Sequence, residues 1–365
     1  MNIYIPLGLL LSLLCFFFRK NEKKAKKAFF FAMILTCIFA MIRYEFGPDY
    51  FNYRDIYEGI QGADINNYVG RGMSVEKPFL FLLQLFPLYT LFVMGLTVLW
   101  FSTNTFFLKK YLPYQYIWIV VLYFFAKTDY FLDSLVAMRT TLCAALFIVA
   151  VFFLIRNRRL LYVTCIVIAS LFHTSAIALL PLVFLNTNRN SLLFKDVVIF
   201  ATGGVAVLSI LIGHNFFVES LSRFVMENVD ELQRYSERDV AIVGQSIYTL
   251  FFRVMSFCIL LYLAKSGEKE TDPKMIVFYK IAVVAAMINL IMGQSLINDR
   301  YFLILNPIYI LCIVSSFKRN PVLTNTIISI FIFVIALYIF YNKYSKPYFV
   351  SFLEYKTIFD APYIP

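Results

Sequence analysis

The stretch from Arg43 to Tyr57 is the part of this chain that membrane physics alone does not explain. It holds two arginines, two aspartates and four tyrosines around a Gly47-Pro48 turn, directly after an apolar run. Arginine offers a permanent charge and a forked donor set that suits phosphate oxygens. Tyrosine joins a flat apolar face to a hydroxyl, which suits sugar rings and membrane interfaces. The stretch therefore predicts a sugar and phosphate site, with a simple interfacial anchor as the alternative.

Two residues could accept a proton from a hydroxyl nucleophile, Asp49 in this stretch and His173 further along. His173 is one of two histidines and lies within a long apolar run. Ionisable groups inside a membrane are costly and tend to mark function. The alternative is a hydrogen-bonded packing role.

Three further arginines border or enter apolar runs. Arg139 and Arg300 each open one, and Arg253 lies seven residues inside another. Arginines at helix ends usually extend toward water, so either of the first two could serve only as an anchor. Arg253 must find a partner or a water-filled cavity. The group is a candidate for binding a diphosphate.

The composition shows that the protein needs a membrane environment. The 365 residues are 61% hydrophobic, with 41 Phe and 25 Tyr, and the mean hydropathy is +0.75. The net charge of +11 comes mostly from short loops between apolar runs, as the positive-inside bias predicts, and does not indicate nucleic acid. The six cysteines fall in apolar runs, without disulfide or metal-ligand spacing. We expect one transmembrane domain over residues 1–365.

The apolar runs predict an all-α polytopic membrane protein of about 11–12 transmembrane helices with broken or re-entrant segments. The cationic cluster after the first run should be cytoplasmic, so outer-face loops are expected at about 43–77 and 214–245. The second of these should contain an amphipathic surface helix. The expected apolar segments are Ile3–Phe18, Ala28–Ile42, Pro78–Phe86, Leu88–Leu108, Tyr114–Ala126, Arg139–Ile155, Leu160–Leu185, Val197–Gly213, Ser246–Ala264, Met275–Gly293, Tyr301–Phe317 and Val322–Tyr341.

Leu160–Leu185 is too long for one crossing. As a helix its residues would span about 39 Å, against a hydrocarbon core of about 30 Å. We therefore predict a break at His173, a cavity beside it, two crossings and an outer C-terminus. That topology places Arg43, Arg139, His173 and Arg300 together at the outer surface. Several arginines at one depth suit a lipid-linked diphosphate, which presents many phosphate oxygens.

Common nucleotide and metal motifs are absent from the sequence. It contains no Gly-rich phosphate loop, Walker motif, zinc spacing or nucleophile elbow. Any reaction would then be driven by an activated substrate, and we expect no cofactor. The Asp-x-Asp pair of many metal-using glycosyltransferases is also missing, so we predict that no metal is needed.

Four elements together resemble the EpsG-like, Wzy-type polysaccharide polymerases of bacteria. They span roughly residues 30 to 320. They are an Arg-x(3)-Gly-x-Asp-Tyr-x(2)-Tyr pattern, a Met-Arg helix start, a Phe-His-x-Ser-Ala element and an Arg-Tyr-Phe start, at Arg43–Tyr53, Met138-Arg139, Phe172–Ala176 and Arg300–Phe302. The chain departs from the pattern at Pro48, often a small polar residue, and at Thr140, where Gln is common.

The resemblance implies a GT-C-like glycosyltransferase fold and a glycosyl transfer at the outer face of the bacterial cytoplasmic membrane. The growing glycan would leave one undecaprenyl diphosphate and join a repeat unit carried by another. Arginines would hold the diphosphate, and Asp49 or His173 would act as base. Tyrosines would stack on sugars. A chain-length regulator is a possible protein partner. The candidates for binding the diphosphate are Arg43, Arg139, Arg253 and Arg300, and those for stacking on sugars are Tyr50, Tyr53, Tyr235 and Tyr301.

Three other functions fit parts of the pattern. A lipid-linked sugar flippase would need cations on both leaflets and usually has duplicated halves, which this chain lacks. A membrane O-acyltransferase acting on glycans would need His173 near a cytosolic acyl donor. In a structural subunit of a synthesis complex, substitution of the arginines would be harmless.

Overall fold

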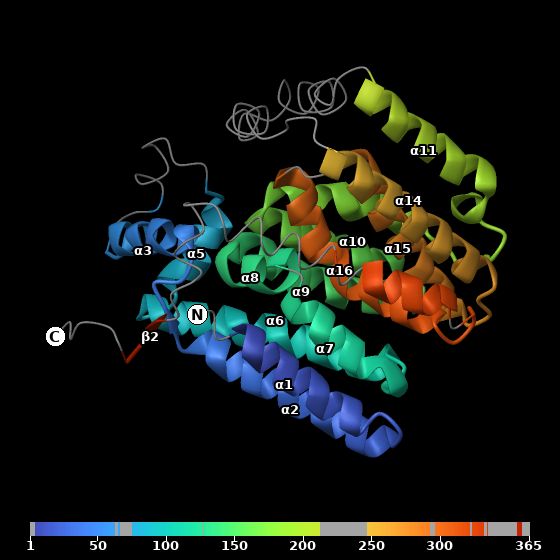
Figure 1. Ribbon diagram of the computed structural model, residues 1–365. Coiled ribbons are helices and arrows are strands. Elements are labelled where there is room, and N and C mark those ends of the chain that lie inside the picture. Colours follow the sequence, from blue (N-terminus) through green and yellow to red (C-terminus); the bar gives the residue numbers. More distant parts are fainter. Residues whose placement is uncertain are drawn as a thin grey trace. The chain divides into compact units, whose positions relative to one another are not determined.

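The computed structural model describes residues 4–62, 65, 75–126, 128–211, 247–292, 296–321, 323–331, 334 and 356–359. In this part of the chain nearly all regular structure is helical, as Figure 1 shows. Two helices, Tyr89–Tyr111 and Pro273–Ile291, are each long and apolar enough to cross a membrane. A third candidate span is a bent pair of helices, and several shorter apolar helices accompany them. The protein is an all-α polytopic membrane protein, as the sequence predicts.

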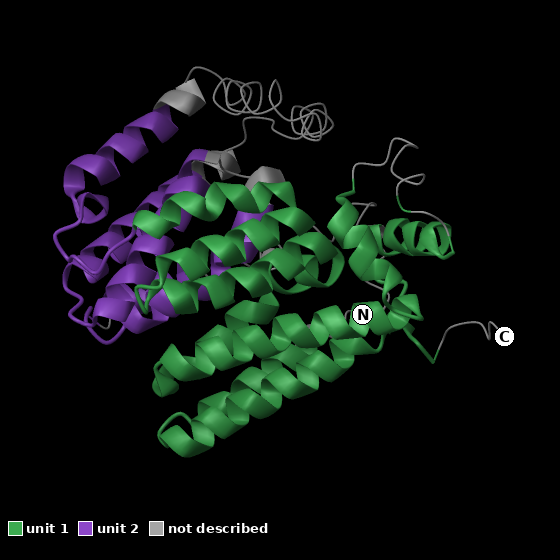
Figure 2. Cartoon of the chain, turned by 180° about the vertical axis from the view of Figure 1, so that it is seen from behind, with its two compact units in different colours: residues 1–184, 332–365 green, residues 185–331 purple. Residues whose placement is uncertain are grey.

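The chain divides into two compact units, coloured separately in Figure 2. The first unit contains residues 1–184 and 332–365, and the second contains residues 185–331. A single membrane domain over the whole chain stays a prediction.

The first unit is a bundle of packed helices. α1 packs on α7, α2 on α6, and α9 on both α6 and α10 (Figure 1). Its elements are α1 (Tyr4–Phe17), α2 (Glu22–Met41), β1 (Arg43–Tyr44), α3 (Pro48–Ile60), α5 (Lys77–Gln84), α6 (Tyr89–Tyr111), η1 (Tyr114–Tyr116), α7 (Ile117–Ala126), α8 (Thr128–Val136), α9 (Met138–Leu154), α10 (Arg159–Phe172), η2 (Thr174–Phe184) and β2 (Lys356–Thr357).

The helices α2, α6 and α9 each run between the same two ends of this unit. α6 begins beside Tyr50, whose carbonyl accepts a hydrogen bond from Tyr89 Oη at 3.0 Å, and it ends at Lys109 and Lys110. Its 23 residues span about 35 Å, close to the thickness of a bilayer core. α2 and α9 join the same ends. We call one the basic end, where Lys26, Lys109, Lys110 and Arg156 line one pocket. The other is the tyrosine end, with Tyr50, Tyr53 and Tyr89.

The stretch from Arg43 to Tyr57, which is expected on the outer face and is called the outer stretch below, is more regular than the sequence indicates. The expected turn is present, and Gly47 adopts φ 82° and ψ 163°, a combination that essentially only glycine tolerates. Pro48, with its fixed φ, then opens the helix α3. The expected loop therefore contains a helix. α2 also begins earlier than expected, at Glu22, where the side chain of Asn21 accepts a hydrogen bond from Lys24 N.

Most of the segment between the expected apolar segments Tyr114–Ala126 and Arg139–Ile155 is also a helix, α8 (Thr128–Val136). α8 leads into α9 with a bend of 118°. The corner is fastened by Thr141 Oγ1, which donates to the carbonyl of Ser134 at 2.7 Å. Before it, Pro78–Leu108 divides as predicted, because a short helix α5 precedes the crossing helix α6.

The predicted break at His173 is confirmed. α10 ends at Phe172, and His173 takes an extended conformation with φ −156° and ψ 111°. The chain continues as the 3₁₀ helix η2, which contains Pro181. Tyr162 Oη donates to the carbonyl of Leu179 at 2.6 Å, so η2 folds back along α10. His173 therefore lies at the tip of a helical hairpin.

A segment from the end of the chain joins the tyrosine end. Arg43 and Tyr44 of β1 pair antiparallel with Thr357 and Lys356 of β2. Ile358 N donates to the carbonyl of Ile42 at 2.8 Å, and its side chain packs on the tyrosine cluster. Residues 356–358 thus hold the start of the outer stretch from the far end of the sequence.

The second unit is built on three packed helices, with α15 between α14 and α16. Arg319 binds the buried Glu270 at 2.6 Å, and Lys280 Nζ donates to the side-chain oxygen of Asn186 at 2.7 Å. Its elements are η3 (Leu192–Phe194), α11 (Asp196–Leu211), α14 (Ile247–Glu268), α15 (Pro273–Met292) and α16 (Leu296–Ser316).

Candidate functional site

A carboxylate joins two of the predicted site residues in the first unit. Glu76 Oε2 lies 2.5 Å from Arg139 Nη1, and Glu76 Oε1 lies 3.5 Å from His173 Nδ1. Thr174 N donates to the same Oε1 at 3.1 Å. On its other side Arg139 Nε donates to Tyr53 Oη at 3.1 Å. We call these residues the Glu76 cluster.

Three members of the cluster stand at helix ends, where the backbone changes direction, and the fourth lies within a helix. Glu76 caps the N-terminus of α5 in extended conformation, just before Pro78. Arg139 is in the first turn of α9, after the sharp bend from α8. His173 is the residue at which α10 stops, and Tyr53 comes from α3. Helix termini are thus gathered at the tyrosine end, with α3 and α10 both in contact with α5.

The cluster is shielded from water, which strengthens its internal electrostatics. The side chains of Glu76, His173 and Arg139 are only 8%, 9% and 14% exposed. Burial alone would raise the pKa of Glu76, but the hydrogen bond with His173 and the charge and hydrogen bonds of Arg139 lower it to about 2. A carboxylate with so low a pKa stays ionised at neutral pH and holds a proton poorly. Glu76 is therefore suited to orient Arg139 and His173, and poorly suited to act as a base.

This electrostatic arrangement predicts an acid-sensitive contribution to stability. Because the pKa of Glu76 is lower folded than unfolded, its contribution is complete above its unfolded pKa of about 4.3 and is lost as the pH falls to about 2. We expect wild type to exceed Glu76→Gln in unfolding free energy by roughly 3 kcal/mol near pH 6, with the two converging toward pH 2. Unfolding in detergent at a series of pH values measures this. A difference that does not change with pH would contradict it.

The other predicted residues of the outer stretch are packed into the bundle. Tyr50 and Tyr53 are buried in an apolar cluster, where the Tyr50 ring meets the Tyr89 ring edge to face at 5.1 Å. Asp49 lies in the first turn of α3 and is partly buried. The stacking of sugars on these tyrosines and the use of Asp49 as base stay predictions.

The partners of Arg43 are backbone and side-chain groups of the surrounding helices. It is 2% exposed, and its guanidinium donates to the hydroxyl of Thr97 at 2.8 Å and to the carbonyl of Leu135 at 2.9 Å. A further hydrogen bond goes to the carbonyl of Ala40. These bonds tie α2 to α6 and α8. Contact between Arg43 and a diphosphate stays a prediction, and this geometry supports a bracing role.

The remaining predicted residues lie elsewhere. Arg253 of α14 is buried and donates to the carbonyls of Ala206 and Leu290 at 3.3 and 3.1 Å, which supplies the partners that a buried guanidinium requires. Arg300 and Tyr301 lie in α16 and are partly buried. These three belong to the second unit, so their meeting with Arg139 stays a prediction. Tyr235 lies outside the described residues.

Sequence reasoning missed Glu76, which connects the site. The available signal was weak: one acidic residue directly before Lys77-Pro78 and an apolar run. An acid before a helix start is ordinarily explained by the helix dipole. Its two main partners are 63 and 97 positions away, at Arg139 and His173. Local patterns do not reveal such contacts.

Comparison with known proteins gives one result. The family model described as the EpsG family matches residues 26–357. Neither the curated proteins nor the solved structures contain a match. The matched range includes the outer stretch, the Glu76 cluster and the β1–β2 pair. The chain therefore belongs to the EpsG family.

Proposed function

We propose that this protein polymerises oligosaccharide repeat units carried on a lipid diphosphate, at the outer face of the bacterial cytoplasmic membrane. Membership of the EpsG family indicates a polysaccharide polymerase of the glycosyltransferase type. The finer assignment rests on one observation: Arg139 and His173 share the carboxylate of Glu76. Arginine is suited to bind a phosphate, and histidine is suited to accept the proton of a hydroxyl.

The distribution of charge supports an outward site. Lys26, Lys109, Lys110 and Arg156 gather at the basic end of the first unit. Short loops rich in lysine and arginine usually stay in the cytoplasm. The Glu76 cluster lies at the opposite ends of the same helices, α6 and α9, and would then face the exterior. The strand β2 at the tyrosine end agrees with the expected outer position of the last residues.

The proposed transfer uses Arg139 and His173 in different roles. The acceptor hydroxyl oxygen forms a bond with the anomeric carbon of the growing glycan while the bond from that carbon to the diphosphate breaks. His173 takes the proton of the hydroxyl, and Arg139 neutralises charge on the departing lipid diphosphate. Glu76 keeps both side chains in position. Asp49 is the alternative base, and Arg43, Arg253 and Arg300 are further candidates for the diphosphate.

Sugar contacts and partners complete the proposal. The candidates for contact with sugars are Tyr50, Tyr53, Tyr235 and Tyr301, because their rings are suited to stacking. The donor and acceptor would both be undecaprenyl-diphosphate-linked oligosaccharides. A chain-length regulator would act beside the polymerase, in the same lipid bilayer.

An O-acyltransferase is supported less well. It would need His173 within reach of a cytosolic acyl donor. In the first unit His173 joins Glu76 and Arg139, at the opposite end of α9 from Arg156. That arrangement favours a reaction on the side away from the basic end.

Purified protein incubated with lipid-diphosphate repeat units, without nucleotide, tests the proposal. We expect a ladder of glycans that grows as repeat units are consumed, with free lipid diphosphate released at each step. His173→Ala should abolish the ladder in folded protein. If wild type in a functional membrane environment yields no ladder but transfers acyl groups or moves the lipid across the bilayer, the polymerase proposal is wrong.

A further inference from the structure

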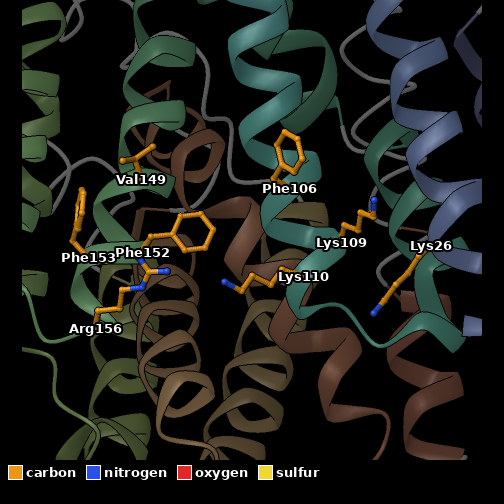
Figure 3. Close-up of a pocket in the computed structure, with 8 residues that line it drawn as sticks. All are labelled: Lys26, Phe106, Lys109, Lys110, Val149, Phe152, Phe153 and Arg156. Atoms are coloured by element: carbon orange, nitrogen blue, oxygen red, sulfur yellow. The ribbon is translucent and has the colours of Figure 1, made fainter. Parts of the chain in front are cut away.

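A second cationic site lies at the basic end of the first unit. Figure 3 shows a pocket between α2, α6 and the end of α9. Its volume is about 620 Å³, and none of its lining residues is acidic. Four cations line it together with four apolar side chains, namely Lys26, Lys109, Lys110 and Arg156 with Phe106, Val149, Phe152 and Phe153. The Glu76 cluster contributes nothing to this pocket.

The lining changes from apolar to cationic along each of two helices. On α6, Phe106 stands one turn before Lys110, on the same face. On α9, Val149 and Phe152 are three residues apart and share one side, and Arg156 follows just past the end of the helix, where it lines the same pocket. The apolar residues precede the cations along α6 and α9, and these cations stand at or just past the ends of the two helices. A ligand that fits has an apolar part at hydrocarbon depth and an anionic part at the surface.

The cations differ in how strongly they are already engaged. Lys26 forms a 2.6 Å ion pair with Glu22. Lys109 lies over the ring of Phe30 at 4.5 Å, and Lys110 lies 5.6 Å from the ring centre of Phe152. Arg156 is exposed, just past the end of α9. Such cation–ring contacts contribute little near the protein surface, so they can be exchanged for contacts with an anion.

We propose that this pocket binds an anionic phospholipid of the cytoplasmic leaflet, with a preference for a headgroup that carries two phosphates. Lys109, Lys110 and Arg156 would hold the phosphates, and acyl chains would lie against Phe106, Val149 and Phe152. Basic pockets between membrane helices on the cytoplasmic side recognise cardiolipin-type headgroups in this way. A free phosphate would use the cations but leave the apolar half of the pocket empty. The choice of leaflet rests on the orientation given above.

A matched pair of variants separates pocket binding from general attraction of charge. The triple variant Lys109→Gln, Lys110→Gln, Arg156→Gln removes three pocket cations. The control triple Lys20→Gln, Lys23→Gln, Lys24→Gln removes three exposed cations that precede or begin α2 and do not line the pocket. Both variants lose the same charge. A third variant, Lys109→Arg, Lys110→Arg, Arg156→Lys, keeps every charge.

Binding is measured on full-length protein in detergent, by native mass spectrometry or microscale titration. The probes are cardiolipin, phosphatidylglycerol, phosphatidylcholine and inorganic pyrophosphate. We expect the pocket triple to bind cardiolipin about tenfold or more weakly. The control triple and the charge-keeping variant should stay within about twofold of wild type. Cardiolipin should bind most tightly, and pyrophosphate should compete poorly.

Equal losses in the two charge-removing triples would overturn the proposal, because the effect would then be unspecific attraction. Equal binding of pyrophosphate and cardiolipin would also overturn it and indicate a phosphate site. If the pocket triple is not monodisperse, Arg156→Gln replaces it, with Lys23→Gln as control, and a loss confined to the former supports the proposal. Because glycan polymerisation is assayed separately with repeat units, failure of lipid binding here leaves the proposed enzymatic function untouched.

Discussion

Replacing Arg139 with alanine should strongly slow the formation of long-chain glycan in protein that still folds. The guanidinium is held by Glu76 at 2.5 Å and by Tyr53 at 3.1 Å, so it is pre-oriented before any substrate arrives. Loss of a preoriented group that stabilises developing charge typically slows a reaction by about 10²–10³-fold. The measurement is the rate of ladder formation from lipid-linked repeats, with protein amounts matched.

Arg54 supplies the control for this experiment. It lies in the same outer stretch and forms a comparable 2.8 Å ion pair, with Glu58, but its side chain is more exposed. Arg54→Ala should leave the rate within about threefold of wild type, because exposed pairs contribute little. Arg139→Lys should recover only part of the activity, since lysine lacks the fork that reaches Glu76 and Tyr53 together. Normal glycan from folded Arg139→Ala protein would show that Arg139 does not act on the diphosphate.

Removing Glu76 should damage stability more than removing Arg139 and Glu76 together. In Glu76→Ala the guanidinium stays buried without its carboxylate, and such an uncompensated charge typically costs about 3–5 kcal/mol. In the double variant Glu76→Ala, Arg139→Ala both charges are gone, so we expect most of that loss to be recovered. The measurement is thermal or denaturant unfolding in detergent, analysed as a double-mutant cycle.

Activity in the same cycle separates structure from chemistry. The double variant should regain stability and remain inactive, because the group proposed for the diphosphate is absent. A double variant that is both stable and active would mean that the pair only braces the fold. Additive stability losses would instead mean that the two residues do not interact in the folded protein. The exposed pair Arg54–Glu58 provides the reference cycle, with an expected coupling of at most about 0.5 kcal/mol.

Local sequence patterns predicted the membrane class and several breaks in the helices. Apolar runs gave the helices because their lengths match a bilayer core. His173-Thr174-Ser175 and Pro181 marked the end of α10, since these residues interrupt an apolar helix. The motif spacing around Arg43, Arg139 and His173 also indicated the family that the family model then matched.

The same patterns could not assign a role to each arginine. Arg43 and Arg139 look alike in sequence, because each stands where an apolar helix meets a polar stretch. In the structure Arg43 braces α2 against α6 and α8, whereas Arg139 reaches a carboxylate on α5. Apart from the carbonyl of Ala40, the partners that distinguish the two arginines lie 54 or more positions away, and contacts over such separations produce no periodic pattern in the sequence.

By itself, then, the sequence determined that this protein is a helical membrane protein with the motifs of the EpsG family, and it supplied the candidates proposed to hold a diphosphate or take a proton. Only the tertiary structure decided that Glu76 joins Arg139 to His173, that α3 occupies the outer stretch, and that residues 356–358 fasten β1. The physical reason is that burial in lipid follows from composition and local spacing. A buried ion pair, by contrast, depends on how distant helix ends meet.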